Sequence, residues 1–249
     1  MLVPTLRNHV VTTLIALLLV GCGGGDPYQG MDAEALFRIA ENEFAEEDWG
    51  NAIEALERLR LNFPDWTRIA EARMMLADAH FQDSEYLTAR SEYQRFRDRF
   101  VAHPLAVVAA LGECRSLAAL SPHPQRDQAH TRDAITVCGN VTVDYAGTPQ
   151  ATEAQQLREA LRYTLAEKEY LNASHYFRRR QYDPAIKYFE FVVNLYPETE
   201  FAPRALLGLY RSNLAIGYND LADEARERLL REYPDSPAAA ELPASGTES

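Results

Sequence analysis

Three cysteines carry the side chains best suited to covalent chemistry in this 249-residue chain: Cys22, Cys114 and Cys138. A cysteine can become a lipid attachment point, pair in a disulfide or remain a small core residue. Enzyme patterns are missing, since the chain has no G-x-x-x-x-G-K, no H-E-x-x-H and no G-x-S-x-G, and its six histidines lack metal-ligand spacing. The sequence therefore predicts a protein that works by binding, with no catalytic residue, metal site or cofactor.

Cys22 follows an apolar segment of export-signal type. Residues 10–20 are apolar apart from threonines, a length typical of a signal-peptide core and well short of the roughly 20 residues that span a bilayer. The run ends in Leu19-Val20-Gly21-Cys22, which resembles the bacterial lipobox. The resemblance implies cleavage before Cys22, a diacylglycerol on its thiol and an N-acyl chain, whereas a cysteine placed there by chance is the alternative.

The expected location follows from these residues. We expect residues 1–21 to be a signal peptide and residues 22–31 a lipidated flexible tether. The residue after the cysteine is Gly23 and not aspartate, which by resemblance to lipoprotein sorting favours the periplasmic face of the outer membrane. The net charge of −12 disfavours nucleic acid and anionic lipid surfaces, so membrane contact is expected through the lipid anchor alone.

From residue 32 onward the chain reads as a helical repeat. Apolar residues recur at three- and four-residue steps, and five segments end with an aromatic residue ahead of a proline. These aromatics are Phe63, Phe100, Tyr145, Tyr196 and Tyr233. A small residue stands eleven positions before each of them, at Ala52, Ala89, Ala134, Ala185 and Ala222. The pattern predicts an all-α tetratricopeptide-repeat solenoid of five helix-turn-helix units.

The spacing of the terminal aromatics, 37, 45, 51 and 37 residues, predicts how the units are divided. We expect units one to three in residues 32–147 and units four and five in residues 148–237. Residues 152–180 read as one extended helix before the turn of the fourth unit. Residues 238–249 are expected to be a disordered tail.

Cys114 and Cys138 fall on the two predicted helices of unit three. The exported compartment permits a disulfide, which would fasten this hairpin across its long loop. Two buried thiols remain the equal alternative, because free cysteine is also a common core residue.

Two groups of residues are candidates for binding partners. The first helices of units one and two carry an aromatic, methionine and acidic set that suits an extended peptide with aromatic side chains. This set is Phe37, Glu41, Phe44, Met74, Asp78 and Phe81. Ordinary core packing is the alternative, and it is favoured for Phe44 and Phe81. Arg178, Arg179 and Arg180 complement a helix C-terminus and also form a patch for a carboxylate-bearing partner.

The "LSPHPQRDQ" loop at 120–128 and the "AEKEYLNASHYFRRRQYDPAI" block at 166–186, with the lipobox and the repeats, resemble the BamD (ComL, YfiO) family of outer-membrane assembly lipoproteins. The resemblance covers essentially the whole mature chain. It implies binding of the periplasmic domains of the β-barrel insertase BamA by the C-terminal repeats. It also implies capture of unfolded outer-membrane proteins by the N-terminal repeats, with other assembly lipoproteins as further partners.

In that family a basic residue on the second helix of unit four contacts BamA. The matching window here offers Lys187 or, in strict register, Tyr188, with Arg204 and Arg211 as neighbouring candidates. The alternative function is a tetratricopeptide lipoprotein that scaffolds cell-wall hydrolases or another envelope complex.

Overall fold

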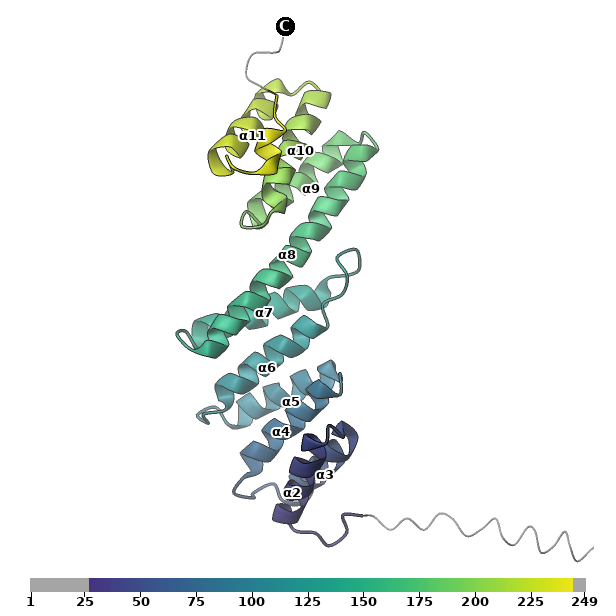
Figure 1. The fold of residues 1–249 in the computed structure, drawn as a ribbon, viewed down its shortest axis with the longest axis vertical. Coiled ribbons are helices and arrows are strands. Elements are labelled where there is room, and N and C mark those ends of the chain that lie inside the picture. The colour runs from purple at the N-terminus through teal and green to yellow at the C-terminus, as the bar shows by residue number, and fades with distance from the viewer. Residues whose placement is uncertain (1–26, 244–249) are drawn as a thin grey trace, which may run out of the picture. The chain divides into compact units, whose positions relative to one another are not determined.

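The structure is a computed structural model that describes residues 27–243, and within this range it contains helices and no strands (Figure 1). Cys22 and the expected signal peptide lie outside the described residues. The helices are α2 (Ala33–Ala45), α3 (Trp49–Asn62), α4 (Ile69–Gln82), α5 (Tyr86–Arg99), α6 (Ala106–Ala119), α7 (Ala129–Asp144), α8 (Pro149–Arg178), α9 (Tyr182–Leu195), α10 (Phe201–Ala215), α11 (Asn219–Glu232) and α12 (Pro237–Ala240). The prediction of an all-α fold is confirmed.

The chain divides into two compact units at residues 72 and 73, within α4. The first unit pairs α2 with α3. Each of these helices begins at an aspartate whose carboxylate accepts a backbone N–H: Asp32 from Ala35 at 2.8 Å, and Asp48 from Asn51 at 3.2 Å. Such caps satisfy amide groups that the first turn of a helix leaves without partners.

The small residues and terminal aromatics of the repeat occupy the positions that the sequence predicts. All five alanines are fully buried. The five aromatics are the C-caps of α3, α5, α7, α9 and α11, and the backbone N–H of each donates to the carbonyl four residues earlier. A buried alanine lets two helices approach closely, while an aromatic that leaves the helix at its last turn covers the end of the core.

The turn inside four of the helix pairs places one residue in the left-handed region of backbone conformation. These residues are Glu47 (φ 60°), Ser84 (φ 62°), Arg180 (φ 59°) and Gly217 (φ 82°), each two positions before the next helix. Only glycine adopts this conformation without a steric penalty.

Gly217→Ala is therefore expected to lower the free energy of unfolding by about 1 kcal/mol, since a Cβ is disfavoured at this φ. Ser84→Gly is the matched control. Loss of the Cβ relieves backbone strain, but glycine raises the entropy of the unfolded chain, so the free energy of unfolding should change by less than about 0.5 kcal/mol. Urea unfolding of the two variants measures both effects. A Gly217→Ala protein as stable as the wild type would contradict this account.

The long helix of the second compact unit is α8, with 30 residues, and its bounds are close to those of the extended helix predicted for 152–180. It begins at Thr148, whose hydroxyl accepts the N–H of Ala151 at 3.2 Å, and carries Pro149 at its first position. Its first half packs with α7 and its second half with α9 (Figure 1). Ala154 and Leu161 belong to the core of α6 and α7, whereas Ala166 and Ala173 belong to the core of α9, α10 and α11. One continuous helix thus joins two hydrophobic cores.

The expectation of a disordered tail over 238–249 is wrong at its start. Residues 237–240 form the short helix α12, which Ser236 caps by accepting the N–H of Ala239 at 3.2 Å. Ala238 and Ala239 are buried in the C-terminal core, and Leu242 packs against it. Burial of these small side chains orders a segment whose composition alone suggests disorder. Residues 244–249 lie outside the described range.

Candidate partner-binding site

The predicted groove residues of repeat unit one lie mostly in the hydrophobic core. Phe37 is 1% exposed, and its ring lies 5.2 Å from that of Trp66 and beneath the guanidinium of Arg68 at 4.4 Å. Phe44 is half-buried with its ring against Trp49 at 4.9 Å. Glu41 is exposed and lies 3.6 Å from Arg68. The prediction that Phe37 lines an open groove is wrong, because its apolar ring is already covered within its own unit.

The predicted groove residues of repeat unit two, which lie on α4, also pack against other side chains. Met74 is 5% exposed, which contradicts its predicted groove role, and Phe81 packs against Tyr86 with ring centroids 5.4 Å apart. Asp78 accepts a 2.6 Å hydrogen bond from the hydroxyl of Tyr93. Burial raises the pKa of the Asp78 carboxyl, which this bond partly offsets, and burial together with Asp78 raises the pKa of Tyr93. The pair therefore fixes α5 on α4 and is not offered to a ligand.

The C-terminal candidates separate into two groups. Lys187 is exposed on α9 and makes no ion pair with any residue of the described range, while Tyr188 stacks on Tyr176 at 5.5 Å with nearly parallel rings. Arg204 and Arg211, one above the other on α10, line a common pocket. Neither Lys187 nor Tyr188 lines this pocket.

We call this hollow the arginine pocket; it has a volume of about 280 Å³. Its residues come from α8, α9, α10 and the segment after α12. They are Tyr170, Ser174, Phe177, Arg178, Phe189, Arg204, Leu207, Gly208, Arg211 and Glu241. Sequence reasoning found three of the arginines but missed the aromatic floor and Glu241, which no spacing connects to them.

The three arginines of the "RRR" run at 178–180 are exposed and occupy different places at the end of α8 and in the turn after it. Arg178 lines the arginine pocket, Arg179 is the C-cap of α8, and Arg180 takes the left-handed position of the turn. Of the three arginines, Arg178 is the one that lines the pocket.

A second, wider hollow lies between the middle of α8 and the turn before α10, and its charged groups are largely paired with one another. Arg162 donates to Glu198 at 2.5 Å and to the carbonyl of Leu195, and the Tyr163 hydroxyl donates to Glu200 at 2.6 Å. Arg162 holds the pKa of the Glu198 carboxyl below its usual range. These contacts brace α8 against the next helix pair.

The loop between α6 and α7, which carries the family-like "LSPHPQRDQ" segment, is built around the side chain of Gln128. This residue is 1% exposed, and its amide nitrogen faces the carbonyls of Pro122, His123, Pro124 and Arg126 at 3.0 to 3.5 Å. Its amide oxygen accepts the hydroxyl of Thr131 at 2.6 Å. One buried amide thus lies among four loop carbonyls, two of which have a second donor: the N–H of Arg126 for His123 and the Lys168 ammonium for Arg126.

Gln128→Ala is expected to lower the free energy of unfolding by about 1–2 kcal/mol, because it removes the amide from the carbonyls of Pro122 and Pro124 and the acceptor of the Thr131 hydroxyl. It should also speed trypsin cleavage after the exposed Arg126. Gln125→Ala, in the same loop but exposed, is the control and should change neither quantity. Equal cleavage rates for the two variants would show that the amide does not hold the loop.

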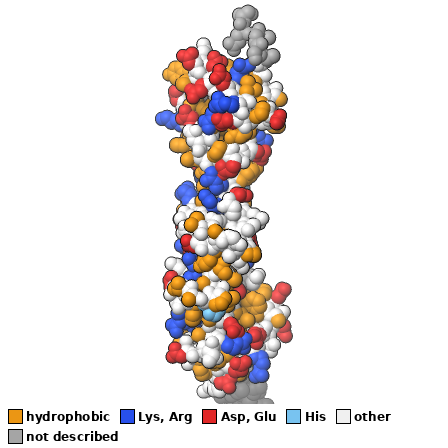
Figure 2. All heavy atoms as spheres, turned by 90° about the vertical axis from the view of Figure 1, so that its left-hand side faces the viewer, with side chains coloured by type: hydrophobic (Ala, Val, Ile, Leu, Met, Phe, Trp, Pro, Cys, Tyr) orange, Lys and Arg blue, Asp and Glu red, His pale blue; other side chains and the backbone are white. Residues whose placement is uncertain are grey.

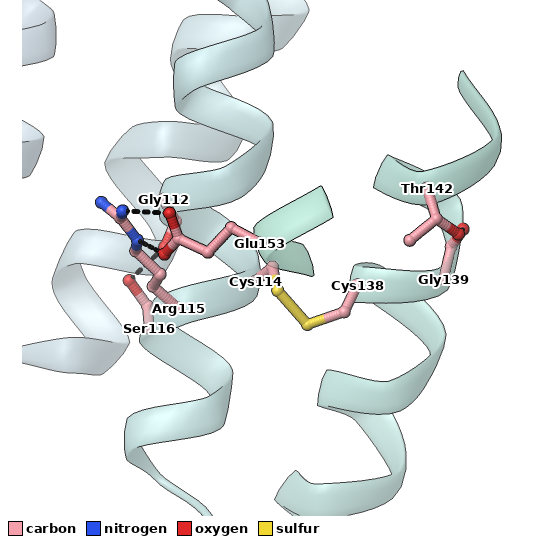
Figure 3. Close-up of a disulfide and its surroundings, with 8 residues drawn as sticks. All are labelled: Gly112, Cys114, Arg115, Ser116, Cys138, Gly139, Thr142 and Glu153. Carbon is pink, nitrogen blue, oxygen red and sulfur yellow. Dashed lines mark hydrogen bonds and ion pairs between the residues drawn. A yellow bond between two sulfur atoms is a disulfide. The ribbon is translucent and has the colours of Figure 1, made fainter. Parts of the chain in front are cut away.

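Cys114 and Cys138 form a disulfide in the structure, between α6 and α7 (Figure 3). Both residues are fully buried, with Cα atoms 4.9 Å apart. Next to the bridge, Arg115 donates to both carboxylate oxygens of Glu153 at 2.6 and 2.7 Å, which ties α6 to α8. The bridge therefore lies where three helices of the second unit meet.

Across residues 27–243 no helix has the length and hydrophobicity to cross a bilayer, and no cluster of potential metal ligands occurs. On the face drawn in Figure 2, acidic and basic side chains are interspersed with apolar ones. The fold defines a class of protein, an all-helical repeat protein.

The comparisons with known proteins identify the family. A family described as "YfiO: Outer membrane lipoprotein" matches residues 29–229. Among curated relatives, the outer membrane protein assembly factor BamD of Caulobacter vibrioides is 25% identical over 86% of this chain and 72% of its own. BamD of Xylella fastidiosa strain Temecula1 is 24% identical over 92% and 83%, and BamD of Neisseria gonorrhoeae is 22% identical over 93% of each. The chain belongs to the BamD (YfiO) family of outer-membrane protein assembly factors.

Two solved structures resemble this chain distantly. The TPR2AB domain of yeast Sti1 in its pHSP90 complex has a TM-score of 0.45 at 13% identity, covering 83% of this chain and 80% of that one. The MamA protein has a TM-score of 0.36 at 15% identity, covering 85% and 96%. The family relatives are named as assembly factors, and the family name associates the chain with the outer membrane.

Proposed function

We propose that this chain is a lipid-anchored scaffold on the periplasmic face of the outer membrane that binds a BamA-type insertase. The C-terminal repeats hold the insertase's periplasmic domains. The observations that carry this proposal are two exposed cations, one on α9 and one on α10: Lys187 has no ion-pair partner among the described residues, and Arg204 pairs with the exposed Glu200 at 3.7 Å. Cations with unused donors in a chain of net charge −12 suit an acidic partner surface.

Binding of the purified periplasmic domains to the full chain tests this assignment. Lys187→Ala and Arg204→Ala should each weaken binding about three- to tenfold, the usual range for losing one partly exposed charge at an interface. Arg38→Ala, an exposed arginine of α2, is the matched control and should bind like the wild type. Unchanged binding by both C-terminal variants would remove this surface from the proposal.

We also propose that the N-terminal repeats receive segments of unfolded outer-membrane proteins. Burial of Phe37 and Met74 restricts the sites available for this role to exposed groups such as Glu41. A photo-crosslinker placed at residue 41 should capture a substrate peptide more efficiently than one at the equally exposed residue 190 of α9. Equal capture at both positions would contradict the N-terminal assignment.

The anchor is assigned to Cys22, which lies outside the described residues. A Cys22→Ala chain should stay uncut and unacylated, because the thiol that accepts the lipid is gone. Mass spectrometry of the mature N-terminus and membrane fractionation test this. Normal maturation of the variant, followed by outer-membrane fractionation, would rule out the lipid anchor.

A further inference from the structure

We propose that the arginine pocket is a binding site for an acidic peptide segment, one with a glutamate or aspartate beside an apolar residue. We further propose that Glu241 of the chain's own C-terminal segment occupies this site until such a segment displaces it. The inference goes beyond the proposed function, because neither the ligand nor the test involves the insertase.

The charge of the pocket points to a carboxylate. Its lining holds three arginines and a single carboxylate, that of Glu241, in a chain whose net charge is −12. Arg178 makes no ion pair with residues of the described range. Arg204 pairs with Glu200 at 3.7 Å, and the side chains of Arg204 and Glu200 are each about half exposed. Guanidinium groups with unused donors recognise carboxylates with good geometry.

The floor of the pocket is apolar and fixed. The rings of Tyr170 and Phe189 lie 6.0 Å apart, and those of Phe177 and Phe189 lie 6.4 Å apart. Gly208 lets the Phe189 ring approach α10 so closely that a Cβ there would stand 2.4 Å from it. A close-packed floor needs no rearrangement before binding, so an apolar neighbour of the carboxylate would find a preformed surface.

A carboxylate of the chain itself already occupies the arginine pocket. Arg211 donates from Nη2 to a carboxylate oxygen of Glu241 at 2.9 Å, and the adjacent Leu242 packs against the C-terminal core. A glutamate is therefore already seated at the site, and the apolar residue beside it packs against the adjoining core. This pair is the pattern that defines the proposed ligand.

The seating of Glu241 has the features of a releasable contact. The Arg211 and Glu241 side chains are 46% and 56% exposed, and an ion pair at that exposure contributes little to stability. The helix that carries the segment, α12, has only four residues and holds its place through two buried alanines. A tethered glutamate still competes strongly, because its effective concentration is on the order of millimolar.

The test uses the full chain and a peptide whose termini are both blocked, acetyl-SPAAAELP-amide, which copies residues 236–243. Nuclear magnetic resonance titration reports binding through the amide signals of α10. The Glu241→Gln chain, which keeps its tail but loses the competing charge, should bind the peptide at least about fivefold more tightly than the wild type. The Glu241→Gln/Arg211→Ala chain should lose this gain.

Two controls define the chemistry. The same peptide with glutamine in place of glutamate should bind at least about fivefold more weakly to the Glu241→Gln chain. Salt at 0.5 M should weaken binding of the glutamate peptide but not of the glutamine peptide, because salt screens exposed charge pairs. Equal affinity of the wild-type and Glu241→Gln chains for the peptide overturns the proposed competition by Glu241. Equal affinity for the glutamate and glutamine peptides overturns the carboxylate site itself. Circular dichroism should show all the chains folded, since the substitutions lie at exposed positions.

Discussion

Reduction of the Cys114–Cys138 disulfide should lower the free energy of unfolding by about 3 kcal/mol. The bridge closes a loop of 24 residues, and the loop-closure entropy that it removes from the unfolded chain corresponds to this amount. Both cysteines are fully buried, so the released thiols would still pack as small core residues and the helices would keep their arrangement. The effect should therefore appear in stability and not in helix content.

Urea unfolding of the chain with and without a reducing agent measures this effect. The Cys114→Ala/Cys138→Ala chain is the matched control: its stability should be lower than that of the oxidised wild type and insensitive to the reductant. Equal midpoints for the oxidised and reduced wild type would mean that the bridge does not form in the folded protein. Non-reducing peptide mapping of protein isolated from the periplasm then decides whether residues 114 and 138 are linked.

Gly208→Ala should destabilise the C-terminal repeats by about 2 kcal/mol. A Cβ at this position would lie 2.4 Å from the Phe189 ring, which is buried and cannot move without opening the core. Overpacking of this kind costs about 1–3 kcal/mol, which here exceeds the gain of about 1 kcal/mol that alanine brings to a helix. We place the effect at the upper end because the contact is with the middle of a packed core.

The control for this prediction is Gly50→Ala in α3, where the nearest atom to an added Cβ is an Asp48 carboxylate oxygen at 3.9 Å. That variant should be as stable as the wild type or more stable, since only helix propensity changes. Phe189→Leu should partly rescue Gly208→Ala, because the smaller side chain leaves room for the methyl group. Additive losses in the double variant would show that the two residues do not share a contact.

The periodic features of the fold were predictable from the sequence because each depends on local chemistry. Ala52 and its four counterparts mark positions where two helices touch, and a large side chain there would force them apart. Each C-cap aromatic, such as Phe63, stands shortly before a proline in the chain, and proline cannot continue a helix. The single helix α8 followed from unbroken periodicity over some thirty residues.

The binding surfaces were harder to predict, for a physical reason. An aromatic or methionine on a helix face can line a groove or fill a core, and the spacing of Phe37 and Met74 is the same in both cases. Their burial depends on partners such as Trp66 that a one-dimensional pattern does not locate. The arginine pocket draws on Tyr170, Arg204 and the tail, which tertiary packing alone brings together.

Order in the tail and in the loop of Gln128 was missed for a related reason. The "PAAA" segment of α12 is too short to be helical by itself, and it is held by burial of two alanines. Gln128 looks like any polar loop residue until its amide is seen among four backbone carbonyls. Both features depend on what surrounds the residue and not on its type.

The central claim is that this helical-repeat protein works as the scaffold of a β-barrel insertase. The most direct measurement is recovery of partners with the full-length, acylated chain from detergent-solubilised outer membranes, followed by mass spectrometry. The account predicts that a BamA-type insertase is recovered with the wild type and depleted when Lys187 and Arg204 are both replaced by glutamate. Recovery of cell-wall hydrolases without an insertase, with normal levels of outer-membrane barrels after depletion of the chain, would contradict it.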